Sequence, residues 1–116
     1  MEIVHQFEPT DLQCGQAVLG MICGIAADDV CRELDNSRET TLAEMRSFLS
    51  AHGFTVSRDR KSVSESGELP SLALLSLETP ICWHWSLYFD GVFYDPQYGI
   101  LTDWPPSNRR YCWSIG

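Results

Sequence analysis

The sequence predicts an α+β protein, with helices in its first half and an antiparallel sheet in its second half. Apolar residues recur at helical spacing up to Gly53, and beyond it they alternate or run together. With 116 residues, 44% of them hydrophobic and 11% aromatic, the chain can form one core and is not disordered. We therefore expect a single domain over residues 1–116, mainly helical over 1–53 and mainly strands over 54–116.

Two helices are expected in the first third of the chain. Residues 14–24 are almost continuously apolar, which predicts a helix buried on most sides, and Asp11 just before them is a candidate N-cap. A shorter helix is predicted over residues 26–34. Asp28 and Asp29 lie near its start, where the helix dipole favours negative charge.

Residues 41–52 have the clearest helical pattern. Thr41 and Glu44 have the spacing of a capping box, in which the two residues satisfy each other's free amides. Gly53 provides the usual C-terminal stop. The apolar stripe that would face the core consists of Leu42, Met45, Phe48 and Leu49.

Short apolar or alternating runs predict five strands in the second half. Two of these runs flank Asp90-Gly91, the kind of two-residue loop that typically joins a β-hairpin. The polar stretch over residues 59–68 is expected to be a surface loop. The predicted strands cover residues 54–58, 72–77, 81–89, 92–94 and 109–115.

The charge of the chain argues against several classes of partner. Eight basic and sixteen acidic residues give a net charge of −8, and residues 1–50 alone hold nine acidic and three basic residues. Such a surface repels phosphate, so we expect no nucleic-acid binding and no docking on anionic membranes. A neutral or basic polypeptide is the partner that this charge favours.

The cysteines and the first residues indicate a reducing compartment. The five cysteines include no Cys-x-x-Cys pair, so the usual zinc and redox spacings are absent. No secretory signal is recognisable, and no apolar stretch approaches the ~20 residues needed to cross a bilayer. We expect a cytoplasmic protein with mostly free thiols, and delivery into another cell stays open.

The predicted hairpin brings an imidazole and a carboxylate together. With Asp90-Gly91 as its loop, Ser86 faces Asp95, and residues two apart on one strand share a face. His84, Ser86 and Asp95 therefore lie on one face, with His84 and Asp95 about 7–8 Å apart by backbone. A carboxylate beside an imidazole orients the ring and stabilises the imidazolium, as in a triad that activates a nucleophile.

Cys14 is the candidate nucleophile. It lies at the start of the first helix, where the helix dipole and free amides favour a thiolate. Gly15 leaves room for a substrate carbonyl, and the Cys14 amide can point at the developing oxyanion. Together with His84 and Asp95, Cys14 completes an acyl-transfer site that needs no cofactor and no metal.

These segments resemble the papain-like cysteine peptidases, and most of all their bacterial double-glycine (bacteriocin-leader) branch. Residues 14–22 resemble the nucleophile helix of that family, and residues 84–99 resemble its histidine strand and Asp-Pro turn. Residues 41–54 resemble the helix and Gly-aromatic exit between them. The resemblance implies a minimal papain-like fold with a catalytic triad of Cys14, His84 and Asp95.

The same resemblance implies a glutamine upstream of the nucleophile as second oxyanion donor, usually six residues before it. Position 8 has that spacing, but it is Glu8. Gln6, eight residues before Cys14, is the favoured candidate, and the adjacent Gln13 is the alternative. The chain is also much shorter than papain, so we expect no complete second lobe.

The remaining candidates have weaker support. The candidates for substrate contact are Gly15, Trp83 and Trp85, although the two tryptophans are most simply core residues. No ligand spacing supports a metal site at Cys14, Cys82 and His84. Four cysteines are expected to be packing residues: Cys23, Cys31, Cys82 and Cys112. Of these, Cys82 shares the face of His84.

The expected function is that of a cysteine-dependent amide hydrolase or acyl transferase on a peptide or protein, most simply a peptidase. Glutamine deamidation and transfer to an amine pass through the same thioester, and the acceptor decides between them. The small size favours a single partner protein, as for small bacterial or phage effectors. The alternative from a different class is a non-catalytic papain-like binding module, which Glu8 favours.

Overall fold

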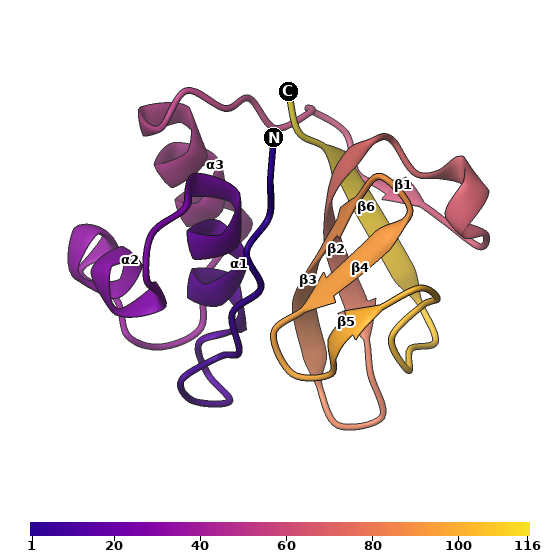
Figure 1. The fold of residues 1–116 in the computed structure, drawn as a ribbon, viewed down its shortest axis with the longest axis horizontal. Coiled ribbons are helices and arrows are strands. Elements are labelled where there is room, and N and C mark those ends of the chain that lie inside the picture. The colour runs from indigo at the N-terminus through magenta and orange to yellow at the C-terminus, as the bar shows by residue number, and fades with distance from the viewer.

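The computed structural model describes all residues from 1 to 116, and it confirms the expected α+β class. Three helices lie on one side of the molecule and a six-stranded antiparallel sheet on the other (Figure 1). The helices are α1 (Cys14–Cys23), α2 (Ala27–Leu34) and α3 (Leu42–Ala51). The strands are β1 (Lys61–Ser62), β2 (Leu72–Glu78), β3 (Trp83–Phe89), β4 (Val92–Asp95), β5 (Gly99–Leu101) and β6 (Arg110–Ser114).

Helix α1 is buried along almost its whole length because it is apolar on nearly every side. All residues from 15 to 22 are buried, and Gly24 ends the helix with a left-handed φ of 73°. The expected cap is wrong, because the N-cap position is Gln13 and no side chain caps the helix; Asp11 lies in the turn before it. The first amides of α1 therefore have no side-chain partner.

The other two helices follow their predictions. α2 carries Asp28 and Asp29 in its first turn, and α3 begins after Thr41, whose capping box with Glu44 is present in both directions. No single helix is long and apolar enough to cross a membrane; only the pair α1 and α2, bent by 106°, passes that test by length and composition.

The sheet has the strand order β1-β6-β2-β3-β4-β5. β3 and β4 form the predicted hairpin, with Leu87 opposite Tyr94 and Phe89 opposite Val92. The loop residues Asp90 and Gly91 have φ values of 46° and 88°, as a tight hairpin turn with this twist requires. The register expected from the sequence is therefore confirmed.

Two expectations for the second half are wrong. Residues 54–58 form only an isolated bridge between Val56 and Ile115, because this segment meets the end of the chain and has no second neighbour. The expected surface loop contains the short edge strand β1 and a turn of 3-10 helix, Ser66–Glu68. Strand β5 was not expected, since it has only three residues and depends on pairing with β4.

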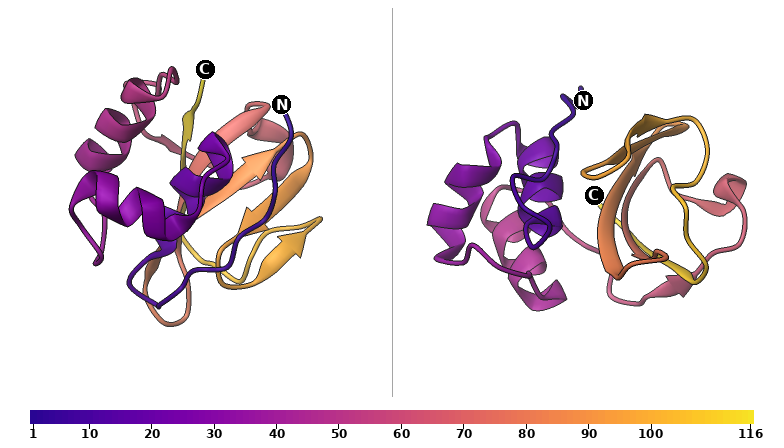
Figure 2. Two further views of the ribbon diagram at one scale, coloured as in Figure 1. Left: turned by 60° about the vertical axis from the view of Figure 1, so that its left-hand side comes forward. Right: turned by 90° about the horizontal axis from the view of Figure 1, so that it is seen from below.

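Two hydrophobic clusters cover the two faces of the sheet. The larger cluster has 14 buried residues and packs the helices against the sheet; it includes Leu19 of α1, Phe48 of α3 and Leu74 of β2. The smaller cluster has six buried residues, including Leu75 and Phe93, on the face that curves away from the helices (Figure 2). Neighbouring residues such as Leu74 and Leu75 serve opposite faces, as strand geometry requires.

The segment before α1 runs between the helices and the sheet and is bonded to both (Figure 1). The Gln6 side chain donates to Ile25 O at 2.6 Å and accepts from Ala27 N–H at 3.0 Å, in the turn between α1 and α2. The Glu8 backbone N–H donates to Pro96 O at 2.8 Å, just after β4. Residue 8 is therefore held beside the end of β4.

Candidate active site

His84 and Asp95 are hydrogen-bonded side chains on neighbouring strands. His84 lies on β3 and Asp95 ends β4, and both are buried. His84 Nε2 lies 2.9 Å from Asp95 Oδ1 and 3.1 Å from Oδ2. The structure thus brings together the two side chains that the hairpin register placed on one face.

Three further donors hold the Asp95 carboxylate in place. Ser86 Oγ donates to Oδ2 at 2.7 Å, and the backbone N–H groups of Gln97 and Tyr98 donate to Oδ1 at 2.8 and 2.9 Å. The turn that follows Asp95 supplies both backbone donors. A carboxylate bound in this way has a defined position, so it can orient the His84 ring.

The protonation of the pair follows from burial and from mutual hydrogen bonding. Burial alone lowers the pKa of His84, but hydrogen bonds and charge interactions with Asp95 and Cys14 outweigh it and raise the pKa to about 10. Burial raises the pKa of Asp95, but its hydrogen bond to His84 and the charge of that ring lower it below its ordinary value overall. An imidazolium and a carboxylate are therefore the favoured forms at neutral pH.

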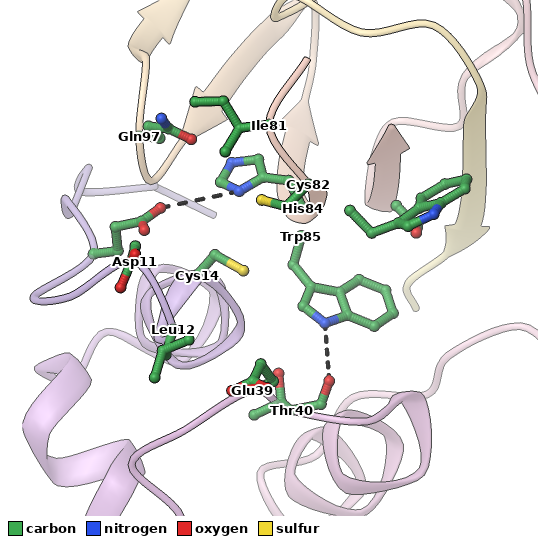
Figure 3. Close-up of a pocket in the computed structure, with 13 residues that line it drawn as sticks. Asp11, Leu12, Cys14, Glu39, Thr40, Ile81, Cys82, His84, Trp85 and Gln97 are labelled. Atoms are coloured by element: carbon green, nitrogen blue, oxygen red, sulfur yellow. Dashed lines mark hydrogen bonds and ion pairs between the residues drawn. The ribbon is translucent and has the colours of Figure 1, made fainter. Parts of the chain in front are cut away.

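Cys14 is the first residue of α1, and its thiol is one of the groups that raise the pKa of His84. Because His84 Nε2 faces Asp95, the other ring nitrogen is the one available to the thiol. Figure 3 shows the side chains of Cys14, Cys82 and His84 directed into one cavity. The structure therefore brings the Cys14 thiol and the His84 imidazole, which Asp95 binds, to one cavity at the uncapped start of a helix.

This cavity has a volume of about 720 Å³. Its apolar wall includes Trp83, which is 48% exposed, and Trp85, whose indole N–H donates to Thr40 O at 3.1 Å (Figure 3). Its acidic residues are Glu8, Asp11 and Glu39. The two tryptophans named from the sequence thus line the cavity, and an extended apolar or cationic group fits its chemistry.

Gly15, the third candidate for substrate contact, does not line the cavity. It is buried against the segment before α3, and a Cβ at this position would lie 1.8 Å from Thr40 Oγ1 and 3.2 Å from Trp85 Cδ1. The missing side chain allows the close approach of Thr40 to α1. Gly15 is therefore a packing residue in this structure.

The structure brings neither glutamine to the Cys14 thiol as an oxyanion donor. Both side-chain polar atoms of Gln6 are bonded at the turn between α1 and α2, at the opposite end of α1 from Cys14. The amide nitrogen of Gln13 donates to Ser37 O at 3.0 Å, behind the helix start. Each side-chain NH2 group thus donates to a backbone carbonyl in the helical half of the chain.

Glu8 was not named as a site residue from the sequence, although it has the spacing of the family's glutamine. Its Oε1 lies 4.0 Å from His84 Nδ1, and its side chain lines the cavity with Cys14. Desolvation by burial raises the pKa of Glu8. The charge of His84 lowers this pKa in part, and the charges of Asp95 and Asp11 raise it. The spacing to Cys14 is the sequence signal that points to position 8, which holds a glutamate in place of the glutamine that the resemblance implies.

The other cysteines differ in their surroundings. Cys31 and Cys112 are buried and Cys23 is half-buried, where burial raises its pKa to about 11. Cys82 is exposed in the loop before β3 and lines the cavity, so for this residue the expectation of core packing is wrong. No group of three or more His, Cys, Asp or Glu side chains is arranged to hold a metal ion.

No protein-family model matches the chain, and no curated protein matches it. Among solved structures, the fold is similar to that of a double glycine motif protease from an AMS/PCAT transporter, crystallised in complex with the leader peptide. The TM-score is 0.67, over 98% of this chain and 91% of that one. At 15% sequence identity this likeness concerns the fold alone, and it confirms the expected minimal papain-like architecture.

Proposed function

We propose that this chain is a cysteine-dependent amide hydrolase, most simply a peptidase, that acts through Cys14, His84 and Asp95. The observation that carries the proposal is the line formed by a buried carboxylate, an imidazole and a thiol, which opens into a cavity at the uncapped start of a buried helix. Burial, orientation and free backbone amides are the conditions under which such a line activates sulfur as a nucleophile.

In the proposed reaction, the Cys14 thiolate attacks the carbonyl carbon of an amide. The S–C bond forms, the carbonyl π electrons move to oxygen, and the Cys14 backbone N–H stabilises the resulting oxyanion. Collapse then breaks the C–N bond as His84 gives its proton to the leaving amine, which leaves a thioester. Water that loses a proton to His84 hydrolyses the thioester, and Asp95 keeps the ring oriented throughout.

A neutral or basic peptide is the proposed substrate. The exposed Trp83 offers apolar surface, and the acidic residues of the cavity favour cationic side chains. The similar protease structure contains a leader peptide, which supports peptide binding by a domain of this fold.

Two alternatives use the same cavity. Deamidation of glutamine and acyl transfer to an amine share the thioester and differ only in the acceptor. A non-catalytic binding module would keep the fold without the chemistry, and one observation favours it: an ionised Glu8 beside His84 would repel an oxyanion.

The substitution Cys14→Ala tests the proposal. We expect the wild-type protein to be labelled by a thiol-directed probe that mimics a peptide amide, and the variant to give no labelling, because Cys14 is the thiol that interacts with His84. Cys82→Ala is the matched control, since it removes the other cysteine of the cavity and should leave labelling in place. Labelling that survives Cys14→Ala would contradict the proposal.

The substrate class is tested by incubating the wild-type protein with candidate peptides and following them by mass spectrometry. Cleavage at an internal amide supports a peptidase, whereas conversion of a glutamine to glutamate supports a deamidase. If the wild-type protein performs neither reaction, and the Cys14→Ala variant still binds a peptide fully, the chain is the binding module instead.

A further inference from the structure

Glu8 carries a buried carboxyl oxygen that has no hydrogen-bond partner. Its side chain is 11% exposed, and Oε1 is buried and unbonded, 4.0 Å from His84 Nδ1. The backbone of Glu8 is fixed by its N–H bond to Pro96 O, so the side chain is held against the cavity that also receives Cys14. A buried carboxyl oxygen normally has a partner, so Oε1 is available to a group that enters this cavity.

The surroundings of Glu8 favour its neutral form. His84 on β3 is the only basic group of the cavity, whereas Asp95 on β4 and Asp11 in the turn before α1 are negative. Burial raises the pKa of Glu8 most, the nearby His84 lowers it, and Asp95 and Asp11 raise it again, so that the pKa lies above its ordinary value overall. A neutral carboxyl group has an O–H, so it can donate a hydrogen bond where a carboxylate cannot.

The remaining titratable groups of the cavity carry no positive charge. They are Cys14 from α1, Glu39 from the segment before α3, and Cys82 from the loop before β3. None of them can stabilise an ionised Glu8 as a cation would.

We propose that Glu8 is the second oxyanion donor of this site and that it acts in its protonated form, through a hydrogen bond from its carboxyl O–H to the carbonyl oxygen of the substrate. This proposal rests on the proposed function of Cys14. As the S–C bond forms and the π electrons move to oxygen, Glu8 keeps its proton and shares it in a hydrogen bond, opposite the donor supplied by the Cys14 amide.

The positions of the glutamines support this assignment. Gln6 and Gln13 both direct their amide nitrogens to backbone carbonyls of the helical half. Glu8 is the side chain upstream of Cys14 that lies in the cavity with an unbonded polar atom beside His84. Among the residues upstream of Cys14, Glu8 is therefore the candidate side chain for this role, and its donor exists only while it is protonated.

This role predicts that attack of Cys14 on a carbonyl becomes slower at high pH, whereas other reactions of the same thiol do not slow for this reason. As pH rises through the raised pKa of Glu8, the donor is lost and a carboxylate takes its place beside the oxyanion. Attack on a carbonyl then becomes slower. Attack on an alkyl halide, which forms no oxyanion, keeps its dependence on the thiolate alone.

The experiment measures two rates at Cys14 as a function of pH: alkylation by iodoacetamide and acylation by p-nitrophenyl acetate. Their ratio cancels the fraction of thiolate. We expect the wild-type ratio to fall by up to about tenfold per pH unit above the pKa of Glu8. Glu8→Gln, whose amide donates at every pH, should keep a constant ratio, and Glu8→Ala should lower it by about 100-fold in the acidic range.

The controls separate this inference from the proposed function. Glu2→Gln removes one charge from an exposed position of the same segment and should follow the wild-type curve. In a Cys82→Ala background, which removes the exposed cysteine of the cavity, Cys14→Ala should abolish both reactions, and if it does not, the proposed function fails. If both reactions occur at Cys14 but the wild-type ratio does not change with pH, only the role of Glu8 is overturned.

A purely electrostatic role is also distinguished. If Glu8 only tuned the Cys14–His84 pair, Glu8→Gln would change both rates in parallel, and its ratio would equal that of the wild type at every pH. This outcome would overturn the inference. The wild-type curve by itself keeps the test decisive if a Glu8 variant does not fold.

Discussion

Asp95 determines the geometry of the site at the scale of single residues. Its two carboxylate oxygens bond the His84 ring, the Ser86 hydroxyl and two backbone amides of the following turn. These bonds compensate for the cost of burying a charge, which would otherwise favour the neutral acid. The aspartate is therefore both a structural anchor of the turn and the group that orients His84.

Asp95→Asn is predicted to lower the pKa of His84 from about 10 towards its ordinary value of 6.5, because the variant loses the negative charge but keeps a similar shape. The imidazole signals of His84 in an NMR titration would measure this change. Hydrolytic activity should fall by about 10⁴-fold, as expected when a ring loses its orienting carboxylate. Asp59→Asn, at an exposed position, should change neither quantity.

The sequence was sufficient to predict the His84–Asp95 pair but not the residue upstream of Cys14. The pair follows from a two-residue turn and strand alternation, which are local rules. The glutamine assignment depended on the path of an extended segment, and Gln6 turns towards Ile25 instead of the thiol. Spacing along the chain does not determine the direction of a side chain in such a segment.

At the scale of elements, α1 and α3 begin in different ways. α3 has a reciprocal capping box between Thr41 and Glu44, whereas no side chain caps α1. Free amides at a helix start are unfavourable unless water or a ligand satisfies them. The start of α3 is thus closed by its own side chains, whereas the start of α1 leaves its amides free for water or a ligand.

Thr41→Ala is predicted to lower the free energy of unfolding by about 1 kcal/mol, because it removes the side chain that accepts from Glu44 N–H. Urea denaturation followed by circular dichroism would measure the loss. Thr55→Ala, an exposed threonine without a capping bond, should stay within about 0.5 kcal/mol of the wild type. Equal effects of the two substitutions would argue against a contribution from the cap.

Gly15→Ala is predicted to destabilise the packing of α1 on the neighbouring segment by about 1–3 kcal/mol, because its Cβ would clash with Thr40 Oγ1. The hydroxyl of Thr40 is buried without a partner, so Thr40→Ala removes the closest contact without breaking a bond, while the contacts to Thr40 Cβ at 3.0 Å and Trp85 Cδ1 at 3.2 Å remain. The double variant should therefore recover part of the lost stability in urea denaturation.

The control for this pair is Gly67→Ala, since a Cβ at Gly67 would meet no atom within 4 Å. It should leave stability nearly unchanged. A Gly15→Ala variant that is as stable as the wild type, or a double variant that is no better than the single one, would contradict the packing role of Gly15.

At the scale of the whole molecule, the buried ionisable groups link stability to pH. The pKa of His84 is raised from 6.5 to about 10, so its contribution to stability is fully present below pH 6.5 and is lost as pH rises through about 10. The pKa of Asp95 is lowered from 3.8, so its contribution is present above that pH and is lost as pH falls below it.

We predict that the free energy of unfolding is larger at pH 6 than at pH 9, because the folded state holds a proton on His84 that the unfolded state releases. Urea denaturation at these two pH values would measure the difference. His84→Gln should make the difference smaller, because glutamine has no ionisable proton. A wild-type protein that is equally stable at both values would contradict the raised pKa.

The sequence by itself determined the elements whose patterns are local or periodic. These include α1, the capping box of α3, the apolar strand β2 and the hairpin that pairs His84 with Asp95. Periodic burial and turn chemistry act over a few residues, so they can be recognised without the rest of the chain.

Only the tertiary structure decided what surrounds the Cys14 thiol. The N-terminal segment is extended and has no periodic pattern, and its position depends on bonds to distant residues, such as His5 to Asp95 O and Glu8 to Pro96 O. These contacts turn Gln6 to the helices and Glu8 to the cavity. Which side chain upstream of Cys14 faces the cavity therefore depends on how the helices and the sheet pack together, because it depends on contacts between residues about ninety positions apart.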